Sequence, residues 1–594
     1  MNDLSPNADR PLPAWDLTDL YPAQDDPAIE ADLVWCEQRA KDLRARGHGK
    51  LAAMSADDLA GIVADYEELS DRIGRLMAFA YLTYATDMSD GVRTRFFQGV
   101  QERINGLSAG TLFLSIEINQ LDDAELEARY AASARLAHYR PWLRDLRTMR
   151  DHMLSDEIER LFHERSITAR NAWTRLFDET VARLRFTVDG KEMPSQEALN
   201  ILQERDRGRR ERAAKEISAV FGRHIETFAL IMNTLIRDKQ IEDDWRGLTA
   251  PEHGRHMLNQ VEPAVVDALR DAVWAKLPDI SHRYYRMKAK WLGLDRLEHW
   301  DRNAALPDND GRTIPWDEGV QLVLNAYERF SPELAAVGRQ FFDNAWIDAA
   351  PRAGKAPGAF AHPVVPSAHP YLLLNYQGHV RDVMTLAHEL GHGVHQVLAG
   401  RQGALMCDTP LTLAETASVF GEMLTFRSLL DSAGNPNRRR PMLASKVEDM
   451  INTVVRQTAF YEFELRLHRQ RRKGELSAEQ IGQTWLDVQT ESLGPAFRFG
   501  DDYSVYWAYI GHFVHVPFYV YAYAFGDCLV NALYAEYQRS PDGFDQRYLE
   551  MLSAGGTLRH KDLLAPFGLD ATDPAFWGRG LSVIEGFIDE LEAM

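Results

Sequence analysis

The stretch Thr385-Leu-Ala-His-Glu-Leu-Gly-His392 decides how the rest of the chain is interpreted, because it carries the spacing H-E-x-x-H. On a helix, His388 and His392 lie one turn apart on the same face, so both imidazoles can bind one metal ion. Glu389 projects beside that ion, where a bound water would lie. Zinc brings the pKa of such a water near neutrality, and a carboxylate within reach can accept its proton. The stretch therefore predicts a zinc-binding helix with its own general base.

The residues around this motif predict that the helix is buried. Apolar side chains occupy most of its faces: Val383, Met384, Leu386, Ala387, Leu390 and Val394. Buried imidazoles and carboxylates need partners, and a divalent cation would partner all three polar side chains of the motif. The alternative is a surface helix with two solvated histidines.

A zinc peptidase site also needs a third protein ligand and an open fourth position. Leu398 stands where one known pattern would place a third histidine, so that pattern is excluded. The acids that follow are Asp408, in a turn before a Thr-Pro pair, and Glu415 and Glu422, both in an apolar helical pattern. We assign Glu415 as the third ligand. We expect Glu422, on the same helix face, to orient a ligand imidazole, with an ordinary ion pair between helices as the alternative.

Three runs of sequence resemble a known family. They are Pro370-Tyr-Leu-Leu-Leu-Asn-Tyr-Gln-Gly378, Asp382-Val-Met-Thr-Leu-Ala-His-Glu-Leu-Gly-His-Gly-Val-His395 and Leu411-Thr-Leu-Ala-Glu-Thr-Ala-Ser-Val-Phe-Gly-Glu422. They closely resemble the oligoendopeptidase F family, which is related to thimet oligopeptidase. The resemblance covers most of the chain and is most specific from about residue 350 to 530. It implies zinc ligands at His388, His392 and Glu415. It also implies Glu389 as the general base.

A second segment, Ile510-Gly-His-Phe-Val-His-Val-Pro-Phe-Tyr-Val-Tyr-Ala-Tyr-Ala-Phe525, is similar to the family's His-plus-tyrosine segment. The resemblance implies that this segment faces the zinc and stabilises the tetrahedral intermediate. Amide hydrolysis needs a donor aimed at the developing oxyanion, and His N–H and Tyr O–H groups are suitable. His512 matches the family's histidine best. Gly511 and Val514 depart from the family's usual Pro and aromatic residue, and His515 has no predicted role.

Pro517 predicts the start of a new helix, with residues 518–525 in its first turns. Tyr519 and Tyr523 would then share a face, whereas Tyr521 would point elsewhere. We therefore expect Tyr519 and Tyr523 to donate to the oxyanion. The alternative is that these tyrosines are core aromatics with hydrogen-bonded hydroxyl groups.

The chain as a whole predicts a mainly α fold: a large multi-helical zinc peptidase with a small β-sheet beside the active-site helix and a deep substrate channel. Helical patterns cover residues 56–80, 92–120, 195–241, 263–292, 317–344, 438–472 and 477–491. A boundary is placed near residue 190, giving an N-terminal helical accessory domain (1–190) and a catalytic zinc metallopeptidase domain (191–594). That the first domain walls the channel is implied by the family resemblance.

Two short strands are predicted beside the metal helix. Tyr371-Leu-Leu-Leu-Asn-Tyr376 is apolar and bounded by proline and glycine, and a second strand is expected near Ala359-Phe-Ala361. A strand edge can hold an extended peptide by main-chain hydrogen bonds, which explains how many sequences could be accepted. A purely structural hairpin is the alternative.

The net charge of −21 argues against nucleic acid as a partner. Basic runs at 205–212, 438–440 and 468–473 are predicted to be solvated helix faces and loops. Polar residues interrupt the apolar stretch 513–534, so no membrane partner is expected. Three cysteines suit a reducing compartment, and the first six residues contain no secretory signal, so a cytoplasmic location is expected.

These observations together predict a zinc-dependent oligoendopeptidase that hydrolyses internal bonds of short unstructured peptides, with one zinc ion per chain. Another divalent metal is possible with the same ligands. The alternatives are a zinc carboxypeptidase or dipeptidase on a similar fold, a non-catalytic peptide-binding protein, and a helical scaffold with a chance motif.

Overall fold

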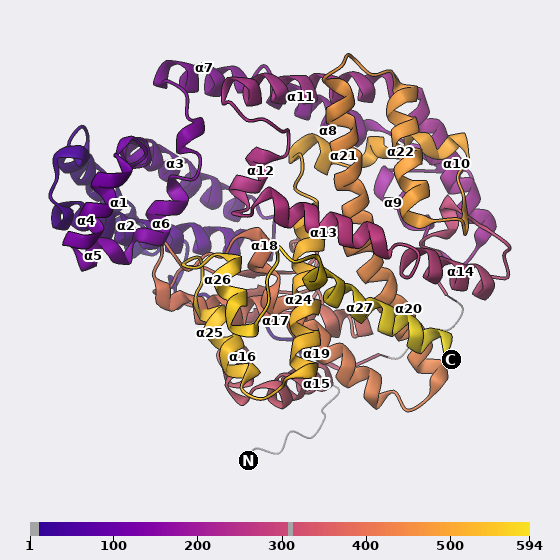
Figure 1. The fold of residues 1–594 in the computed structure, drawn as a ribbon. Coiled ribbons are helices and arrows are strands. Elements are labelled where there is room, and N and C mark those ends of the chain that lie inside the picture. Colours follow the sequence, from indigo (N-terminus) through magenta and orange to yellow (C-terminus); the bar gives the residue numbers. More distant parts are fainter. Residues whose placement is uncertain (1–10, 307–312) are drawn as a thin grey trace. The chain divides into compact units, whose positions relative to one another are not determined.

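The computed structural model describes residues 11–306 and 313–594, and most of them are helical (Figure 1). The chain forms two compact units, each assembled from three stretches of sequence. Unit 1 comprises Met1–Arg150, Gly311–Ser432 and Glu536–Leu569, and unit 2 comprises Asp151–Asp310, Ala433–Ala535 and Asp570–Met594. The predicted mainly α class is confirmed. The domain boundary near residue 190 and the deep channel remain predictions. The first six residues, on which the expectation about secretion rested, lie outside the described part.

Unit 1 contains the helices of the first 150 residues and those around the candidate metal site. They are α1 (Pro27–Gly47), α2 (Ala56–Thr86), α3 (Gly91–Gln120), α4 (Asp123–Ala132), α5 (Ala134–His138), α6 (Arg140–Leu146), α15 (Trp316–Phe330), α16 (Pro332–Asp343), α17 (Val380–Ala399), α18 (Leu411–Ala414), α19 (Thr416–Ser432), α25 (Phe544–Ser553) and α26 (His560–Leu564). Helix α17 packs against α19, α15, α16 and α25.

Unit 2 is also helical. Its helices are α7 (Asp156–Ser166), α8 (Arg170–Arg183), α9 (Ser195–Ile201), α10 (Arg207–Arg223), α11 (Ile225–Trp245), α12 (His253–Leu258), α13 (Pro263–Lys276), α14 (Ser281–Trp291), α20 (Pro436–Ile451), α21 (Gln457–Arg471), α22 (Ala478–Leu493), α23 (His512–His515), α24 (Tyr521–Arg539) and α27 (Pro574–Glu592). The last residues of α24 belong to unit 1. A π-helical turn, Asn452–Arg456, joins α20 to α21.

Several long helical patterns are divided where the backbone turns. The pattern over 195–241 forms three helices, and the pattern over 317–344 breaks at Ser331. Ser331 accepts a hydrogen bond from the N–H of Leu334, and Pro332 follows at the first helical position. A serine cap followed by proline starts a new helix, so the interruption is encoded locally. Ser477 and Gln480 form a capping box at the start of α22.

A three-stranded sheet lies in unit 1, with strand order β4 (Ile347–Asp348), β6 (Tyr371–Leu373), β5 (Phe360–His362). β5 is antiparallel to β6 and pairs Ala361 with Leu372, whereas β4 is parallel to β6. Both β5 and β6 pack against α17. The two predicted strands and their place beside the motif helix are therefore confirmed, and β5 is an edge strand of this sheet.

Unit 2 contains two separate pairs of short strands. β1 (Phe186–Val188) and β2 (Lys191–Met193) form an antiparallel hairpin. β3 (Leu297–Glu298) runs parallel to β7 (Phe497–Arg498).

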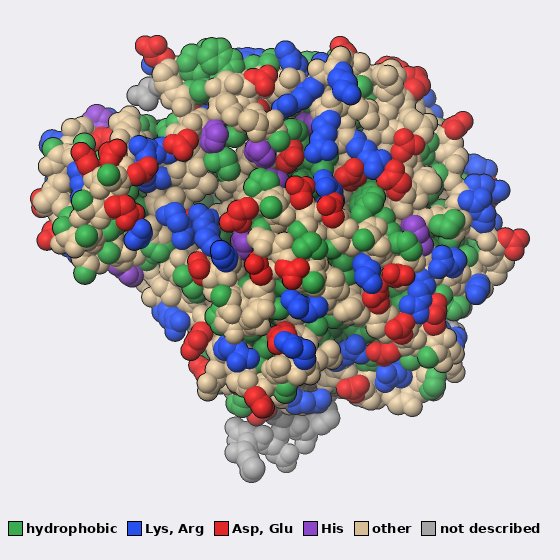
Figure 2. Space-filling model, in the orientation of Figure 1, with side chains coloured by type: hydrophobic (Ala, Val, Ile, Leu, Met, Phe, Trp, Pro, Cys, Tyr) green, Lys and Arg blue, Asp and Glu red, His purple; other side chains and the backbone are tan. Residues whose placement is uncertain are grey.

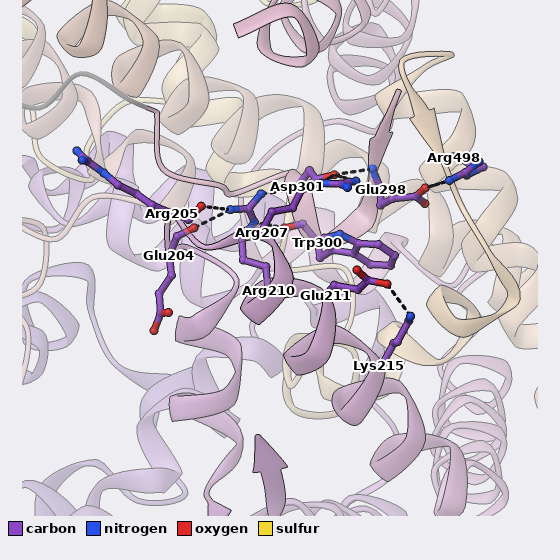
Figure 3. A network of polar contacts seen from close by, with 10 residues as sticks. All are labelled: Glu204, Arg205, Arg207, Arg210, Glu211, Lys215, Glu298, Trp300, Asp301 and Arg498. Carbon is purple, nitrogen blue, oxygen red and sulfur yellow. Dashed lines mark hydrogen bonds and ion pairs between the residues drawn. The ribbon is translucent and has the colours of Figure 1, made fainter. Parts of the chain in front are cut away.

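An ionic network in unit 2 corrects one expectation about the basic runs. Arg210 is 2 % exposed, and its Nη2 lies 2.8 Å from Oδ1 of the fully buried Asp301. Arg207 reaches the other oxygen of Asp301, Oδ2, at 3.0 Å, and Glu298 pairs with Arg498 (Figure 3). The run 205–212 is therefore not simply a solvated face, because two of its arginines neutralise a buried carboxylate. His468, at the start of another basic run, is also buried.

The surface carries both signs of charge. Figure 2 shows acidic and basic side chains interspersed over the face in view. In the described parts of the chain, no helix has both the length and the apolar character needed to cross a membrane. Cys36, Cys407 and Cys528 are free thiols.

Candidate active site

Helix α17 carries the H-E-x-x-H motif and begins at a defined turn. Gly378, with φ +88°, ends the strand region, and the N–H of His379 donates to Oδ2 of Asp382 at 2.9 Å in a capping box. At Gly391 the helix comes so close to α19 that a Cβ atom would lie 2.5 Å from the carbonyl oxygen of Ala417. The glycine in the motif therefore allows the close approach that brings Glu415 beside the histidines.

His388, His392 and Glu415 form one cluster of possible metal ligands. Nε2 of His388 and Nε2 of His392 each lie 3.4 Å from Oε2 of Glu415. The two imidazole rings are nearly perpendicular, with centroids 4.9 Å apart. All three side chains are half-buried, so the cluster remains open to solvent on one side.

This arrangement fits a tetrahedral zinc ion. Ligand atoms about 2.05 Å from zinc and at tetrahedral angles lie about 3.3 Å from one another. The two histidine–glutamate separations of 3.4 Å match that edge length. The donor set of two imidazoles and one carboxylate leaves a fourth position free, as a catalytic zinc site requires.

Glu415 lies at a break in its helix. α18 ends at Ala414, Glu415 forms the cap, and α19 begins at Thr416, so the predicted continuous helix is two helices. The hydroxyl group of Ser418 donates to Oε2 of Glu415 at 2.7 Å and to its carbonyl oxygen at 3.1 Å. Sequence reasoning missed Ser418, although a serine three residues after a ligand on a helix is a local signal for such a contact.

Glu422 lies on the far side of His388. Its Oε2 is 3.4 Å from Nδ1 of His388, so it contacts the imidazole nitrogen that faces away from Glu415. A carboxylate in this position fixes the tautomer in which the other nitrogen carries a free lone pair. Asp408, the alternative third ligand, is not part of the described cluster.

Glu389 is 8 % exposed and adjoins the edge strand. The backbone of Ala361 in β5 acts on the Glu389 carboxylate and slightly opposes the rise in its pKa, and the carbonyl of Ala361 accepts a hydrogen bond from Nε2 of Gln396 at 3.4 Å. The backbone of Ala361 therefore lies against α17. Sequence reasoning did not identify this contact, since it depends on how the strand packs on the helix.

The pKa values in the cluster reflect burial and charge. Burial raises the pKa of Glu389. Burial also opposes ionisation of Glu415, but the hydrogen bond and positive charge of His392 outweigh it and lower the pKa to about 2. Burial lowers the pKa of His388, but Glu422 and Glu415 outweigh that effect and raise it. The site thus keeps Glu415 ionised, and an anionic carboxylate is the form that binds a cation.

The second predicted group, His512, Tyr519 and Tyr523, lies together in unit 2. Nε2 of His512 is 3.4 Å from the hydroxyl oxygen of Tyr523. The ring of Tyr519 stacks on His512 at 6.1 Å and meets Tyr523 edge-on at 5.3 Å. All three side chains are half-buried. Burial lowers the pKa of His512, which favours its neutral form.

Tyr521 is separated from this group. It is 1 % exposed, and its hydroxyl group is 2.9 Å from Nδ2 of Asn259 and 3.1 Å from Nδ1 of His256. The core-aromatic interpretation therefore applies to Tyr521. His515, which had no predicted role, pairs through Nε2 with Oδ1 of Asp178 at 2.9 Å.

The predicted helix start at residue 518 is wrong. α24 begins at Tyr521, and Phe518 has a left-handed backbone with φ +60°. Tyr519 therefore lies in the turn before the helix and not on its first face. The physical reason is that a helix cannot continue through the left-handed backbone of Phe518.

Two family models match this chain. The model of peptidase family M3 matches residues 200–583, and the oligopeptidase F model matches residues 117–186. Oligopeptidase PepF of Bacillus subtilis (strain 168) is 25% identical over 98% of this chain and 87% of its own length. The plasmid-encoded oligoendopeptidase F of Lactococcus lactis subsp. cremoris is 24% identical over 98% of this chain and 97% of its own length.

Solved structures share the fold. A candidate peptidase from Chlamydophila abortus superposes with a TM-score of 0.87 at 23% identity, covering 98% of both chains. Oligoendopeptidase F from Enterococcus faecium gives a TM-score of 0.71 at 21% identity, covering 96% of this chain and 99% of its own. With residues 200–583 matched to the family model and relatives aligned along nearly the whole length, the chain belongs to peptidase family M3 and is a metalloendopeptidase.

Proposed function

We propose that this metalloendopeptidase is a zinc-dependent oligoendopeptidase that hydrolyses internal bonds of short unstructured peptides. The observation that carries the proposal is the cluster of His388, His392 and Glu415, whose 3.4 Å separations suit tetrahedral zinc. The names of the curated relatives, which are oligopeptidases and oligoendopeptidases, support the substrate class.

In this proposal His388, His392 and Glu415 hold the zinc. When bound, zinc supplies Lewis acidity that makes water a better nucleophile and polarises a carbonyl group. Glu422 holds the His388 ring in the ligating tautomer, and Ser418 fixes one oxygen of Glu415.

Glu389 acts as the general base in this proposal. Its carboxylate accepts the proton of the attacking water and passes it to the leaving amine. The low exposure of Glu389 excludes bulk water from its carboxylate. General bases of this kind contribute a rate factor of about 10² to 10⁴.

His512, Tyr519 and Tyr523 are assigned as donors to the oxyanion. Their mutual contacts and their shared half-exposure support a common role, in contrast to the buried Tyr521. A neutral imidazole and two phenol groups each carry a hydrogen-bond donor. When such donors are held in place, they stabilise a developing negative charge.

The edge strand β5 is proposed to hold the substrate main chain. β5 lies at the edge of the sheet beside α17 and pairs with β6 on one side, so an extended peptide could exchange main-chain hydrogen bonds with its other side. Main-chain recognition is insensitive to side-chain identity, which suits a peptidase acting on many sequences.

The test is mass spectrometry of products from a peptide mixture that ranges from short oligomers to folded proteins. Zinc-loaded enzyme and its Glu389→Gln variant are compared. We expect internal cleavage of short peptides only, and loss of cleavage in the variant with unchanged zinc content. Stepwise release of terminal residues would favour a carboxypeptidase or dipeptidase. Binding of peptides without any cleavage by the zinc-loaded protein would favour a non-catalytic role.

A further inference from the structure

The turn that carries Tyr519 is held by groups outside the segment itself. Phe518, fully buried and with φ +60°, precedes Tyr519. A non-glycine residue rarely adopts this left-handed conformation, so the surrounding structure must impose it. Two titratable residues of unit 2 contact this turn: the buried Glu464 in α21 and the half-buried Arg255 in α12.

Glu464 contacts the turn through a main-chain hydrogen bond. Its Oε1 accepts the N–H of Phe518 at 2.9 Å, and the side chain is 2 % exposed. Its Oε2 is buried and has no hydrogen-bond partner among the described residues. A carboxyl group is costly to bury, and this one makes a single main-chain hydrogen bond. The hydrogen bond that the structure shows for Glu464 therefore goes to the main chain of this turn.

Arg255 contacts the same turn from another side. Its Nε donates to the carbonyl oxygen of Pro517 at 3.3 Å, and its guanidinium carbon lies 6.0 Å from the centre of the Tyr519 ring. The two contacts bracket Phe518: one on the residue before it and one on the residue after it. A guanidinium over a phenol ring also limits the orientations that the ring can adopt.

We propose that Glu464 and Arg255 form a clamp on residues 517–519 that positions Tyr519 against His512 and Tyr523 for oxyanion stabilisation. This inference rests on the proposed function, since it assumes that Tyr519 donates to the oxyanion. Both residues are positioning residues, because they act through the turn and not on the substrate. A displacement of about 1 Å in such a donor can lower turnover about 100-fold.

The test compares four variants with the wild-type zinc-loaded enzyme. Glu464→Leu removes the acceptor, whereas Glu464→Gln keeps a neutral oxygen at the same place. Arg255→Gln removes the guanidinium group next to the Tyr519 ring and keeps a polar side chain at a half-buried position. This variant tests the clamp if Glu464→Leu does not fold. Glu462→Leu is the matched control, because it lies on the same helix and pairs with Arg466, not with the turn.

We expect Glu464→Leu and Arg255→Gln to lower kcat at least about tenfold with little change in KM, because the oxyanion exists only in the transition state. Glu464→Gln should recover most of the wild-type kcat, and Glu462→Leu should retain it. In a Tyr519→Phe background, Glu464→Leu should cause no further loss. An equal loss in both backgrounds would overturn the clamp, and so would wild-type kcat in Glu464→Leu where Tyr519→Phe itself lowers kcat.

Hydrogen exchange of peptides spanning residues 516–520 separates this inference from the proposed function. Faster exchange in Glu464→Leu, reversed in Glu464→Gln, supports the clamp even if Tyr519→Phe alone leaves activity intact. In that case only the oxyanion role of Tyr519 fails. Unchanged exchange in Glu464→Leu overturns the clamp whatever the activity of Tyr519→Phe.

Discussion

Glu422 and Glu415 contact opposite nitrogens of the same imidazole, His388: Glu422 is 3.4 Å from Nδ1 and Glu415 is 3.4 Å from Nε2. In the proposed zinc site, this relationship makes Glu415 a ligand and Glu422 the group that orients the imidazole. Only one of them can share a metal ion with His388, because the ring presents a single ligating nitrogen to the cluster.

Replacing Glu422 by Gln should therefore weaken metal binding without abolishing it. Loss of an orienting carboxylate commonly lowers metal affinity about 10- to 100-fold. Zinc affinity measured by competition with a chelator would check this, with Glu415→Ala as the comparison. Glu415→Ala should lose more, because it removes a ligand. If the two variants lost affinity in the opposite order, the roles of the two carboxylates would be exchanged.

Removal of the metal should abolish hydrolysis and lower stability. Without a cation, ionised Glu415, Glu422 and the buried Glu389 lose the charge that partners them. Dialysis against a chelator should lower the thermal midpoint and eliminate cleavage, and one equivalent of zinc should restore both. Full activity of a protein shown by elemental analysis to contain no metal would contradict the zinc assignment.

Gly391→Ala should damage the site although it touches no ligand. The added Cβ would lie 2.5 Å from the carbonyl oxygen of Ala417 and 2.6 Å from Cα of Ser418, so α17 and α19 must move apart. Overpacking of this kind costs about 1–3 kcal/mol. We expect lower thermal stability and lower zinc affinity together. Gly61→Ala in α2, where a Cβ meets open space, is the control and should be neutral or slightly stabilising.

Replacing Tyr519, Tyr521 or Tyr523 by phenylalanine should give two kinds of defect, one in turnover and one in stability. Tyr519→Phe and Tyr523→Phe should lower kcat and leave the thermal midpoint nearly unchanged. Tyr521→Phe should destabilise the protein by about 1 kcal/mol, because its buried hydroxyl group contacts Asn259 and His256. Steady-state kinetics and thermal unfolding of the three variants check this. A kcat loss confined to Tyr521→Phe would reassign the donor.

Stability should fall with rising pH through Glu464. Burial raises the pKa of Glu464 to about 8, although Arg255 and Lys239 oppose the shift. Between the ordinary glutamate pKa of about 4.3 and this value, the unfolded chain has lost the proton that the folded protein retains. Wild type should therefore lose stability relative to Glu464→Gln from about pH 5 to 8, measured by denaturant unfolding. A constant difference across that range would contradict the raised pKa.

Local spacing determined much of the candidate site. The four-residue interval between His388 and His392 sets their common face, and Glu389 follows from its place between them. The apolar pattern around Glu415, the proline and glycine that bound the strand at Tyr371, and the cap at Ser477 are also local signals. For that reason the helical class, the strand pair β5–β6 and the grouping of the three candidate ligands could be predicted.

Only the tertiary structure decided the features that depend on distant residues. The left-handed turn at Phe518 is hydrogen-bonded to Glu464, 54 residues earlier, and the sequence around Pro517 predicted a helix that does not form there. The burial of Arg210 depends on Asp301, 91 residues later, and no local pattern distinguishes it from a solvated arginine. Periodicity reports which face of an element is apolar, whereas the pairing of buried polar groups is fixed by packing between elements far apart in the chain.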